Sequence, residues 1–229
     1  MKNIYFVRHG RTEWNAIRRM QGQWNSNLDD LGRQQADVSG RLLAGCNIEA
    51  MFASPLDRTR QTAALINRYL QLPIVFDDRL KEWDCGDWSG YLYADIETRW
   101  PEEWRRWRAD PFYYRAPNAE NYPDMIARAT PFLDELHTHA AQNIAIVSHG
   151  MIGKAMISTL LGFDEKTTLS FHQPNDRVFR VTLNSSGARV AHYNGIDGPF
   201  AGVETHDEGA ATNRAQDSAP TDLRTPHAF

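Results

Sequence analysis

The chain contains only two cysteines among its 229 residues, Cys46 and Cys85, and they lie far apart. Two distant cysteines form neither a disulfide framework nor a metal-ligand pattern, so we expect two reduced thiols. No apolar stretch approaches the roughly 18 residues that a membrane-spanning helix needs. The apolar run at the start is four residues long, which is too short for a signal peptide. These absences favour a protein of the reducing cytoplasm with no membrane partner.

A strong net charge of either sign is also missing. The 25 Lys and Arg against 29 Asp and Glu leave a formal net charge of −4. No global basic field attracts nucleic acid, so local cations must attract any anionic ligand. Residues 204–229 hold five acids and two arginines but almost no large apolar side chains. We therefore expect one domain over residues 1–203 and a disordered tail over residues 204–229.

Short apolar runs alternate with helical patterns through the rest of the chain. Such alternation predicts an α/β fold, a three-layer sandwich with a mainly parallel sheet and helices on both faces. The expected strands span residues 3–7, 50–53, 74–76 and 144–147, followed by a hairpin of residues 177–183 and 189–193. The expected helices span residues 14–20, 31–44, 55–70, 122–140 and 150–161.

Residues 91–120 interrupt this alternation because they are rich in aromatic and basic side chains. Trp100, Trp104 and Trp107 recur there at helical spacing, with several arginines among them. We expect this segment to form a small helical cap over the strand ends. The tryptophans are expected to pack inside the cap, and most of the arginines to lie on its surface.

A cation, an imidazole and a glycine follow the first apolar run directly, as Arg8, His9 and Gly10. A short apolar run before a polar turn is typical of a buried strand, and open α/β sheets place their active sites at the carboxyl ends of their strands. Histidine can act as a nucleophile and form a covalent intermediate. Taken alone, the cluster is as consistent with a solvated basic turn as with an active site.

This cluster begins the first of five segments that together resemble the histidine phosphatase superfamily, also called phosphoglycerate mutase-like. The segments span residues 8–15 (RHGRTEWN), 28–36 (LDDLGRQQA), 54–63 (SPLDRTRQTA), 80–90 (LKEWDCGDWSG) and 147–150 (VSHG). Each segment alone is a weak signal, whereas five in the family's order are a strong one. The resemblance implies the phosphatase branch, acting on a small phosphate ester without a cofactor or a metal ion.

A phosphate monoester carries nearly two negative charges, so several donors must converge on its oxygens. Arg8 and Arg58 offer planar guanidinium groups that suit bidentate phosphate contacts. Arg58 lies in the first turn of an expected helix, where Ser54 and Asp57 would form a capping box. Its side chain and the free backbone N–H groups at that helix start can then face the same anion.

Glu82 is the candidate acid. Phosphoryl transfer to His9 expels an alkoxide, which leaves poorly unless it is protonated. A carboxyl group in a partly desolvated pocket can supply that proton and later accept one from water. The resemblance places the acid at Glu82, and Asp84 and Asp87 are its rivals in the same loop.

The resemblance assigns the other roles by position. His149 follows the strand of residues 144–147 and would hold the transferred phosphoryl group, as would the side-chain amide of Asn15 and the start of a helix at Gly150. The expected catalytic residues are therefore His9, Glu82 and His149. The expected phosphate-binding residues are Arg8, Asn15, Arg58 and Gly150.

Two stretches depart from the family pattern. Between the first two segments the family often reads Gln-Gly-x-x-Asp-x-Pro-Leu-Thr, but residues 21–29 lack that aspartate, proline and threonine. The cap usually ends in Gly-Gly-Glu-Ser, whereas residues 118–121 read NAEN. Asn121 and Asp124 can still form a capping box, but we expect the pocket to differ from those of relatives. The candidate pocket residues are Gln21, Gly22 and Glu120.

Mutases of the family usually carry Glu-Ser, Asn-Lys and Asn-Ser at three places where this chain has residues 11–12 (RT), 91–92 (YL) and 151–152 (MI). These differences favour a phosphatase over mutase-type phosphoryl transfer, which is the alternative. A non-catalytic binding module is disfavoured because the nucleophile, both arginines and the acid are present. The sequence does not select the phosphate ester. A homodimer is a further option, because dimers are common in the family.

Overall fold

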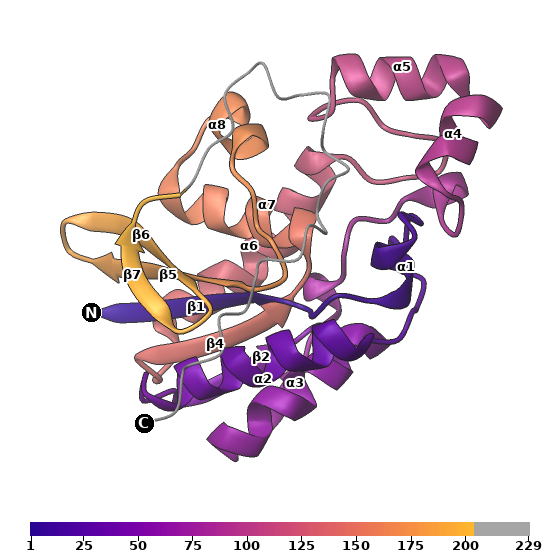
Figure 1. The fold of residues 1–229 in the computed structure, drawn as a ribbon. Helices are drawn as coiled ribbons and strands as arrows, with labels where there is room; N and C mark the ends of the chain where they lie inside the picture. The colour runs from indigo at the N-terminus through magenta and orange to yellow at the C-terminus, as the bar shows by residue number, and fades with distance from the viewer. Residues whose placement is uncertain (204–229) are drawn as a thin grey trace.

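The computed structural model describes residues 1–203, so the expected tail of residues 204–229 lies outside the described residues. One mixed sheet runs through the molecule in the order β3-β2-β4-β1-β5-β6-β7 (Figure 1). Its parallel part consists of β1 (Lys2–Arg8), β2 (Ala50–Ala53), β3 (Ile74–Phe76) and β4 (Asn143–Ser148). Its antiparallel part consists of β5 (Arg177–Asn184), β6 (Gly187–Asn194) and β7 (Asp197–Ala201).

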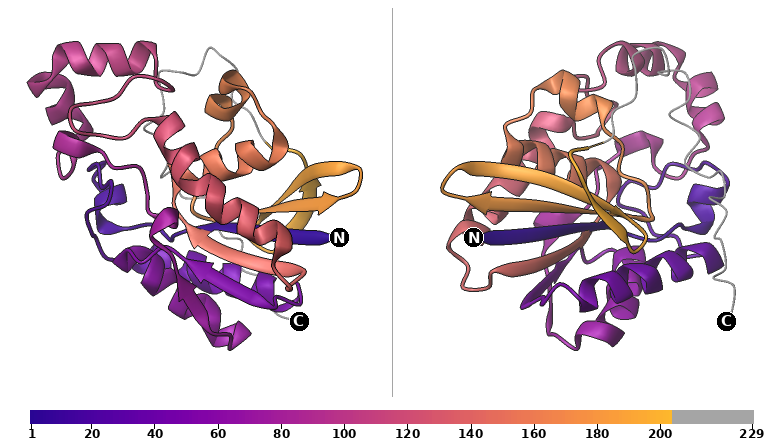
Figure 2. Two further views of the ribbon diagram at one scale, coloured as in Figure 1. Left: turned by 180° about the vertical axis from the view of Figure 1, so that it is seen from behind. Right: turned by 60° about the vertical axis from the view of Figure 1, so that its left-hand side comes forward.

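Helices cover both faces of the sheet, as predicted (Figure 2). Because successive side chains of a strand point to opposite faces, β1 contributes Ile4 and Phe6 to one apolar cluster and Tyr5 and Val7 to another. The first cluster contains side chains of α6 (Tyr122–Thr138) and α7 (Gly150–Leu161). The second contains side chains of α2 (Asp30–Ala44) and α3 (Asp57–Leu70). This arrangement confirms the three-layer α/β sandwich.

The helix starts agree with the sequence except at α3. Asn121 and Asp124 form the expected capping box before α6. The predicted box of Ser54 and Asp57 is wrong, because α3 begins after Leu56 without a side-chain cap. The Ser54 hydroxyl lies 2.8 Å from Nε2 of His149 instead.

A second correction concerns the predicted helix of residues 14–20. Only α1 (Glu13–Ala16) forms there. Arg18 adopts a left-handed backbone conformation with φ 57°, which ends helical geometry. Arg19 then pairs with Leu92 in an isolated β-bridge, so this stretch joins the base of the cap.

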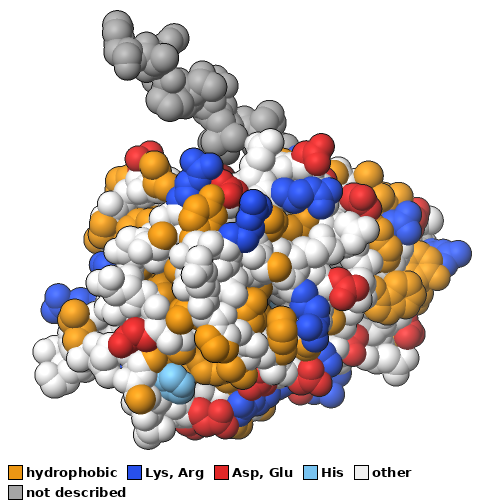
Figure 3. Space-filling view, turned by 90° about the horizontal axis from the view of Figure 1, so that it is seen from below, with side chains coloured by type: hydrophobic (Ala, Val, Ile, Leu, Met, Phe, Trp, Pro, Cys, Tyr) orange, Lys and Arg blue, Asp and Glu red, His pale blue; other side chains and the backbone are white. Residues whose placement is uncertain are grey.

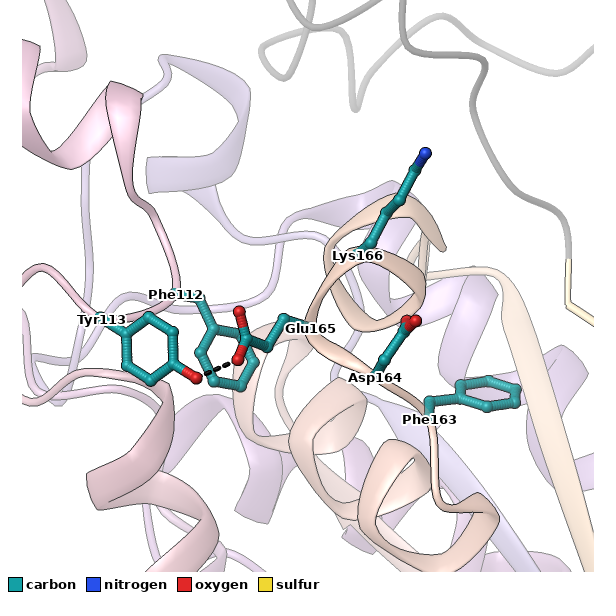
Figure 4. Close-up of a pocket in the computed structure, with 6 residues that line it drawn as sticks. All are labelled: Phe112, Tyr113, Phe163, Asp164, Glu165 and Lys166. Atoms are coloured by element: carbon teal, nitrogen blue, oxygen red, sulfur yellow. Dashed lines mark hydrogen bonds between the residues drawn. The ribbon is translucent and has the colours of Figure 1, made fainter.

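The cap contains α4 (Tyr93–Arg99) and α5 (Pro101–Ala109), which stand apart from the sheet (Figure 1). Trp104 and Trp107 stack with ring centroids 5.1 Å apart, and Trp83 and Trp88 from the loop before the cap pack against them. The tryptophans thus form the interior of the cap, as predicted. The hydroxyl of Tyr113 also donates to Glu165 of a helix beyond α7 (Figure 4).

Several small elements were not predicted. They are β7, α8 (Glu165–Ser170) and the 3-10 turns η1 (Asp78–Leu80) and η2 (Gly86–Trp88). Strand β7 is exposed at every position and therefore has no alternating apolar pattern. On the face shown in Figure 3, basic and acidic side chains are interspersed. Within residues 1–203, no helix has the length and apolar character to cross a membrane.

Candidate active site

Two predicted site residues, His9 and His149, meet at one edge of the sheet. Strands β1, β2 and β4 are parallel neighbours, so their carboxyl ends lie side by side. They deliver His9, Ser54 and His149 to that edge. The rings of His9 and His149 pack edge to face with centroids 5.2 Å apart, and both side chains are almost fully buried.

The imidazole of His9 is held in one orientation. The backbone N–H of His9 donates to Ser148 O over 2.9 Å, and its backbone carbonyl accepts from Nδ2 of Asn175 over 2.6 Å. Its Nδ1 lies 2.8 Å from Gly10 O. A carbonyl oxygen only accepts, so Nδ1 carries the proton and Nε2 keeps its lone pair. Burial, together with the charges of Arg58 and Arg8, lowers the pKa of His9 well below 6.5, which keeps this imidazole neutral.

Arg58 lies in the first turn of α3 and is 1% exposed. It donates to Trp24 O and Gly22 O, each over 2.7 Å. Burial lowers its pKa to about 10, so it remains a cation at neutral pH. Gly22 has φ +51°, and a Cβ atom there would lie 2.7 Å from Sγ of Cys85. Gly22 therefore supports Arg58 through a backbone that other residues would strain.

Arg8 lies beside Gly150, and His149 directly precedes Gly150 at the start of α7. Arg8 donates from Nη1 to Gln173 O over 2.9 Å, and a Cβ atom at Gly150 would lie 3.3 Å from Nε of Arg8. Gly150 begins α7 as predicted. Burial and the charge of Arg58 lower the pKa of His149 well below 6.5. Its Nδ1 is buried and has no hydrogen-bond partner within residues 1–203.

The carboxylate of Glu82 lies on the first turn of α7, next to His149. Its Oε1 accepts from the backbone N–H of Trp83 over 2.9 Å and of Ile152 over 3.1 Å. Its Oε2 accepts from the N–H of Met151 over 3.2 Å. These three hydrogen bonds fix the Glu82 carboxylate against the start of α7.

The two rival acids have other contacts. Oδ1 of Asp84 accepts from the N–H of Gly86 over 2.9 Å, which closes a turn within the loop. Asp87 is exposed, and its Oδ1 accepts from Nδ2 of Asn118 over 3.0 Å. The geometry therefore favours Glu82 among the three acids.

Asn15 and Gln21 both contact Thr12 through their amide oxygens. Oδ1 of Asn15 accepts from the N–H of Thr12, and Oε1 of Gln21 accepts from its hydroxyl, each over 3.1 Å. The Asn15 contact completes a capping box at α1. In the described part of the chain, neither amide nitrogen donates a hydrogen bond to another residue. Both NH₂ groups can therefore still donate to a ligand.

Comparison with known proteins agrees with this geometry. The model of the histidine phosphatase superfamily (branch 1) matches residues 4–195. The chain belongs to this superfamily. It is similar to phosphoserine phosphatase 1 of Hydrogenobacter thermophilus, with 33% identity over 75% of this chain and 82% of that protein. It is also similar to a protein of Erwinia tasmaniensis named "probable phosphoglycerate mutase GpmB", with 34% identity over 81% and 87% of the two chains.

The fold agrees with solved structures of the same kind. The alpha-ribazole phosphatase of Shigella flexneri superposes with a TM-score of 0.78 at 26% identity, over 89% of this chain and 100% of that chain. The hollow shown in Figure 4 is lined by Phe112, Tyr113, Phe163, Asp164, Glu165 and Lys166. None of these residues is a predicted site residue of this histidine phosphatase.

Three polar residues near the site were not predicted to contribute to it. Ser54 contacts His149, Asn175 holds the backbone of His9, and Arg128 contacts the loop that carries Glu82. Glu120, a candidate pocket residue, forms an ion pair with Arg128. Asn175 and Arg128 act on backbone carbonyls, which leave no motif in the sequence. Only Ser54 lies in one of the five family segments, that of residues 54–63, where the pattern predicts that its hydroxyl caps a helix.

Proposed function

We propose that this protein hydrolyses the phosphate monoester of a small metabolite through a phosphohistidine on Nε2 of His9. One observation carries the proposal. A neutral, buried imidazole, whose Nε2 has no hydrogen-bond partner among residues 1–203, lies near the guanidinium groups of Arg8 and Arg58. A neutral imidazole is the nucleophilic form. Membership of the superfamily and the phosphatase names of its relatives support the same reaction.

In the first step, Nε2 of His9 attacks phosphorus in line with the leaving oxygen. The N–P bond forms while the P–O bond to the organic group breaks, and protonated Glu82 gives its proton to the leaving oxygen. In the second step, water attacks phosphorus and gives a proton to Glu82. The N–P bond breaks, inorganic phosphate leaves, and His9 and protonated Glu82 are restored.

The remaining residues stabilise the charge on the transferred group. Arg8, Arg58, His149 and the amide of Asn15 would contact its equatorial oxygens, and the start of α7 at Gly150 would add a backbone donor. Nε of Arg58 and Nδ1 of His149 are buried without a partner in the described chain. A phosphate oxygen would satisfy both atoms. Since these side chains supply the cations, no step needs a metal ion.

The substrate class and the compartment are also proposals. The phosphatase-named relatives favour a small phosphorylated metabolite over a macromolecule. Cys46 and Cys85 are both free thiols, which supports a reducing cytoplasm. Mutase-type transfer is the second candidate, because a protein named a phosphoglycerate mutase is 34% identical. The two functions differ in whether water or a second hydroxyl group accepts the phosphoryl group.

The test is phosphate release from an aryl phosphate in the presence of a chelator, for the wild type and His9→Ala. We expect turnover that resists the chelator and that the substitution abolishes. Turnover that survives in His9→Ala would remove His9 as the nucleophile. No phosphate release by a folded wild type, but phosphoryl exchange between phosphoglycerates, would favour the mutase. Neither activity would favour a binding module.

A further inference from the structure

The loop that carries Glu82 accepts hydrogen bonds from one arginine of α6, Arg128. Nη1 of Arg128 donates to Arg79 O over 2.8 Å and to Lys81 O over 2.9 Å. Nη2 of the same side chain donates to Glu82 O over 3.3 Å. The contacts on Lys81 and Glu82 are the informative ones. These two carbonyls belong to the peptide groups on either side of the Cα atom of Glu82.

Glu120 fixes the orientation of that guanidinium group. Its Oε1 accepts from Nε of Arg128 and its Oε2 from Nη2, each over 2.8 Å. Oε2 also accepts from the N–H of Asp84 over 3.0 Å, and the carbonyl of Glu120 accepts from Nε1 of Trp83. A bidentate pair of this kind defines the plane of the guanidinium group as well as its position.

All five N–H groups of Arg128 therefore have acceptors. Three are carbonyls of residues 79–82, here called the acid loop, and two are the carboxylate oxygens of Glu120. A lysine in place of Arg128 would carry its three donors on one atom, which cannot reach acceptors on both the acid loop and Glu120 in the same way. Fixing both peptide groups beside a Cα atom also fixes the direction of its Cβ. The direction in which the Glu82 side chain leaves the backbone thus depends on a residue 46 positions away in the chain.

We propose that Arg128, held by Glu120, is a positioning residue for the proton transfer by Glu82. The proposal rests on the proposed function, because it requires Glu82 to be the acid. Arg128 itself would not contact the substrate. It places the carboxyl group within reach of the leaving oxygen, where a small displacement costs much of the rate.

The test uses leaving groups of different basicity. An alkoxide needs a proton when it leaves, whereas 2,4-dinitrophenolate does not, so only the first reaction depends on the acid. The measured quantity is kcat/KM, which reports formation of the phosphohistidine. For Arg128→Gln we expect a loss of about 100-fold with an alkyl phosphate and of at most about threefold with 2,4-dinitrophenyl phosphate. Arg128→Lys should resemble Arg128→Gln, since geometry rather than charge carries the effect.

A second bidentate pair offers a matched control. Arg79 donates to Glu135 over 2.7 and 2.8 Å at the same junction of loop and α6, but within residues 1–203 its side chain forms no hydrogen bond to Lys81 or Glu82. Glu135→Gln should change kcat/KM by less than about twofold with either substrate. Glu120→Gln keeps the guanidinium group and the side-chain size, so it tests the proposal if Arg128→Gln does not fold. We expect it to show the same dependence on the leaving group at about tenfold.

Two results separate the possible failures. Equal losses with both substrates in the Arg128 and Glu120 variants would overturn the positioning role and leave Arg128 as a purely structural residue. The parallel variant Glu82→Gln tests the function beneath it. If Glu82→Gln loses no more rate with the alkyl phosphate than with the dinitrophenyl ester, Glu82 is not the acid, and the proposed mechanism fails together with this inference.

Discussion

His9 and Glu82 are held in the site in different ways. His9 directly follows a central strand of the sheet, and its backbone contacts come from a neighbouring strand and from Asn175. Glu82 lies on a loop. Its carbonyl accepts from Arg128 of α6, its carboxylate accepts from the start of α7, and the neighbouring Asp84 donates to Glu120 at the end of the cap. The position of the nucleophile is therefore set mainly by the sheet. The position of the acid depends on contacts from helices outside its own loop.

We call Arg8, His9, Arg58 and His149 the strand-end cluster. Substitutions in this cluster should lower kcat/KM equally for all leaving groups, and Arg58 should give the largest effect. Arg58→Met removes a buried cation that would face the phosphoryl group in both steps. We expect kcat/KM to fall about 1000-fold with alkyl and with dinitrophenyl phosphate alike. Arg60→Met is the control, because Arg60 lies on the same helix but is exposed and stacks on Phe76. A loss confined to the alkyl phosphate would contradict the division between the two regions.

Asn175 tests how far the position of His9 depends on one contact. Asn175→Ala leaves the buried carbonyl of His9 without this donor. We expect kcat/KM to fall by about tenfold or more with both leaving groups, and the free energy of unfolding to fall by about 1–3 kcal/mol. Asn175→Asp should be at least as harmful, because a carboxylate cannot donate to the carbonyl. Steady-state kinetics and urea denaturation measure the two effects, and unchanged kcat/KM would refute the assignment.

Stability against pH should report the two histidines of the strand-end cluster. Burial lowers the pKa of His9 and of His149 well below 6.5. Below about pH 6.5 the unfolded chain therefore binds protons that the folded protein does not, and folding loses free energy as the pH falls. We expect the full contribution above that pH and a decline of up to about 1.4 kcal/mol per pH unit for each histidine below it.

Urea denaturation between about pH 7.5 and 5.5 measures this slope, a range above the usual titration of carboxylates. His149→Gln should make it clearly shallower, even if the variant is less stable overall. An equally steep slope in the variant would contradict the assignment. It would point to other groups as the cause.

The smallest effect concerns the structural contribution of Glu82. Its carboxylate accepts from Met151 and Ile152 at the start of α7, as a helix cap does. Glu82→Ala should lower the free energy of unfolding by about 1 kcal/mol, and Glu82→Gln by less, because the amide keeps an acceptor oxygen. Chemical denaturation distinguishes them. Equal stability of Glu82→Ala and the wild type would show that the acid loop and α7 are not coupled through this side chain.

The same contrast explains what the sequence could predict. Apolar runs and the residues directly after them were sufficient to predict β1 and β4 and to bring His9 and His149 to one edge of the sheet. A strand that contributes no apolar pattern, such as β7, leaves no comparable signal. The predicted helix of residues 14–20 failed because Arg18 and Arg19 follow the geometry of the cap base rather than their helical propensity.

The site shows a similar limit. The Ser54 hydroxyl could cap a helix or contact His149. The sequence indicates only the cap, because the capping pattern is local, whereas the contact with His149 joins residues far apart in the chain. Arg128 and Asn175 contact carbonyl oxygens, which every residue has, so no spacing of side chains could indicate their partners. The residues that touch the phosphoryl group were thus easier to predict than the residues that hold them.

The most direct test of the central claim is to locate the phosphoryl group on the enzyme during turnover. Rapid mixing with an aryl phosphate, followed by an alkaline quench and peptide mass spectrometry, would trap a phosphohistidine, which is stable to base but labile to acid. We expect one phosphoryl group, on His9, formed as fast as the phenol is released. A phosphoryl group on another residue, or a burst of phenol with no phosphorylated enzyme, would contradict it.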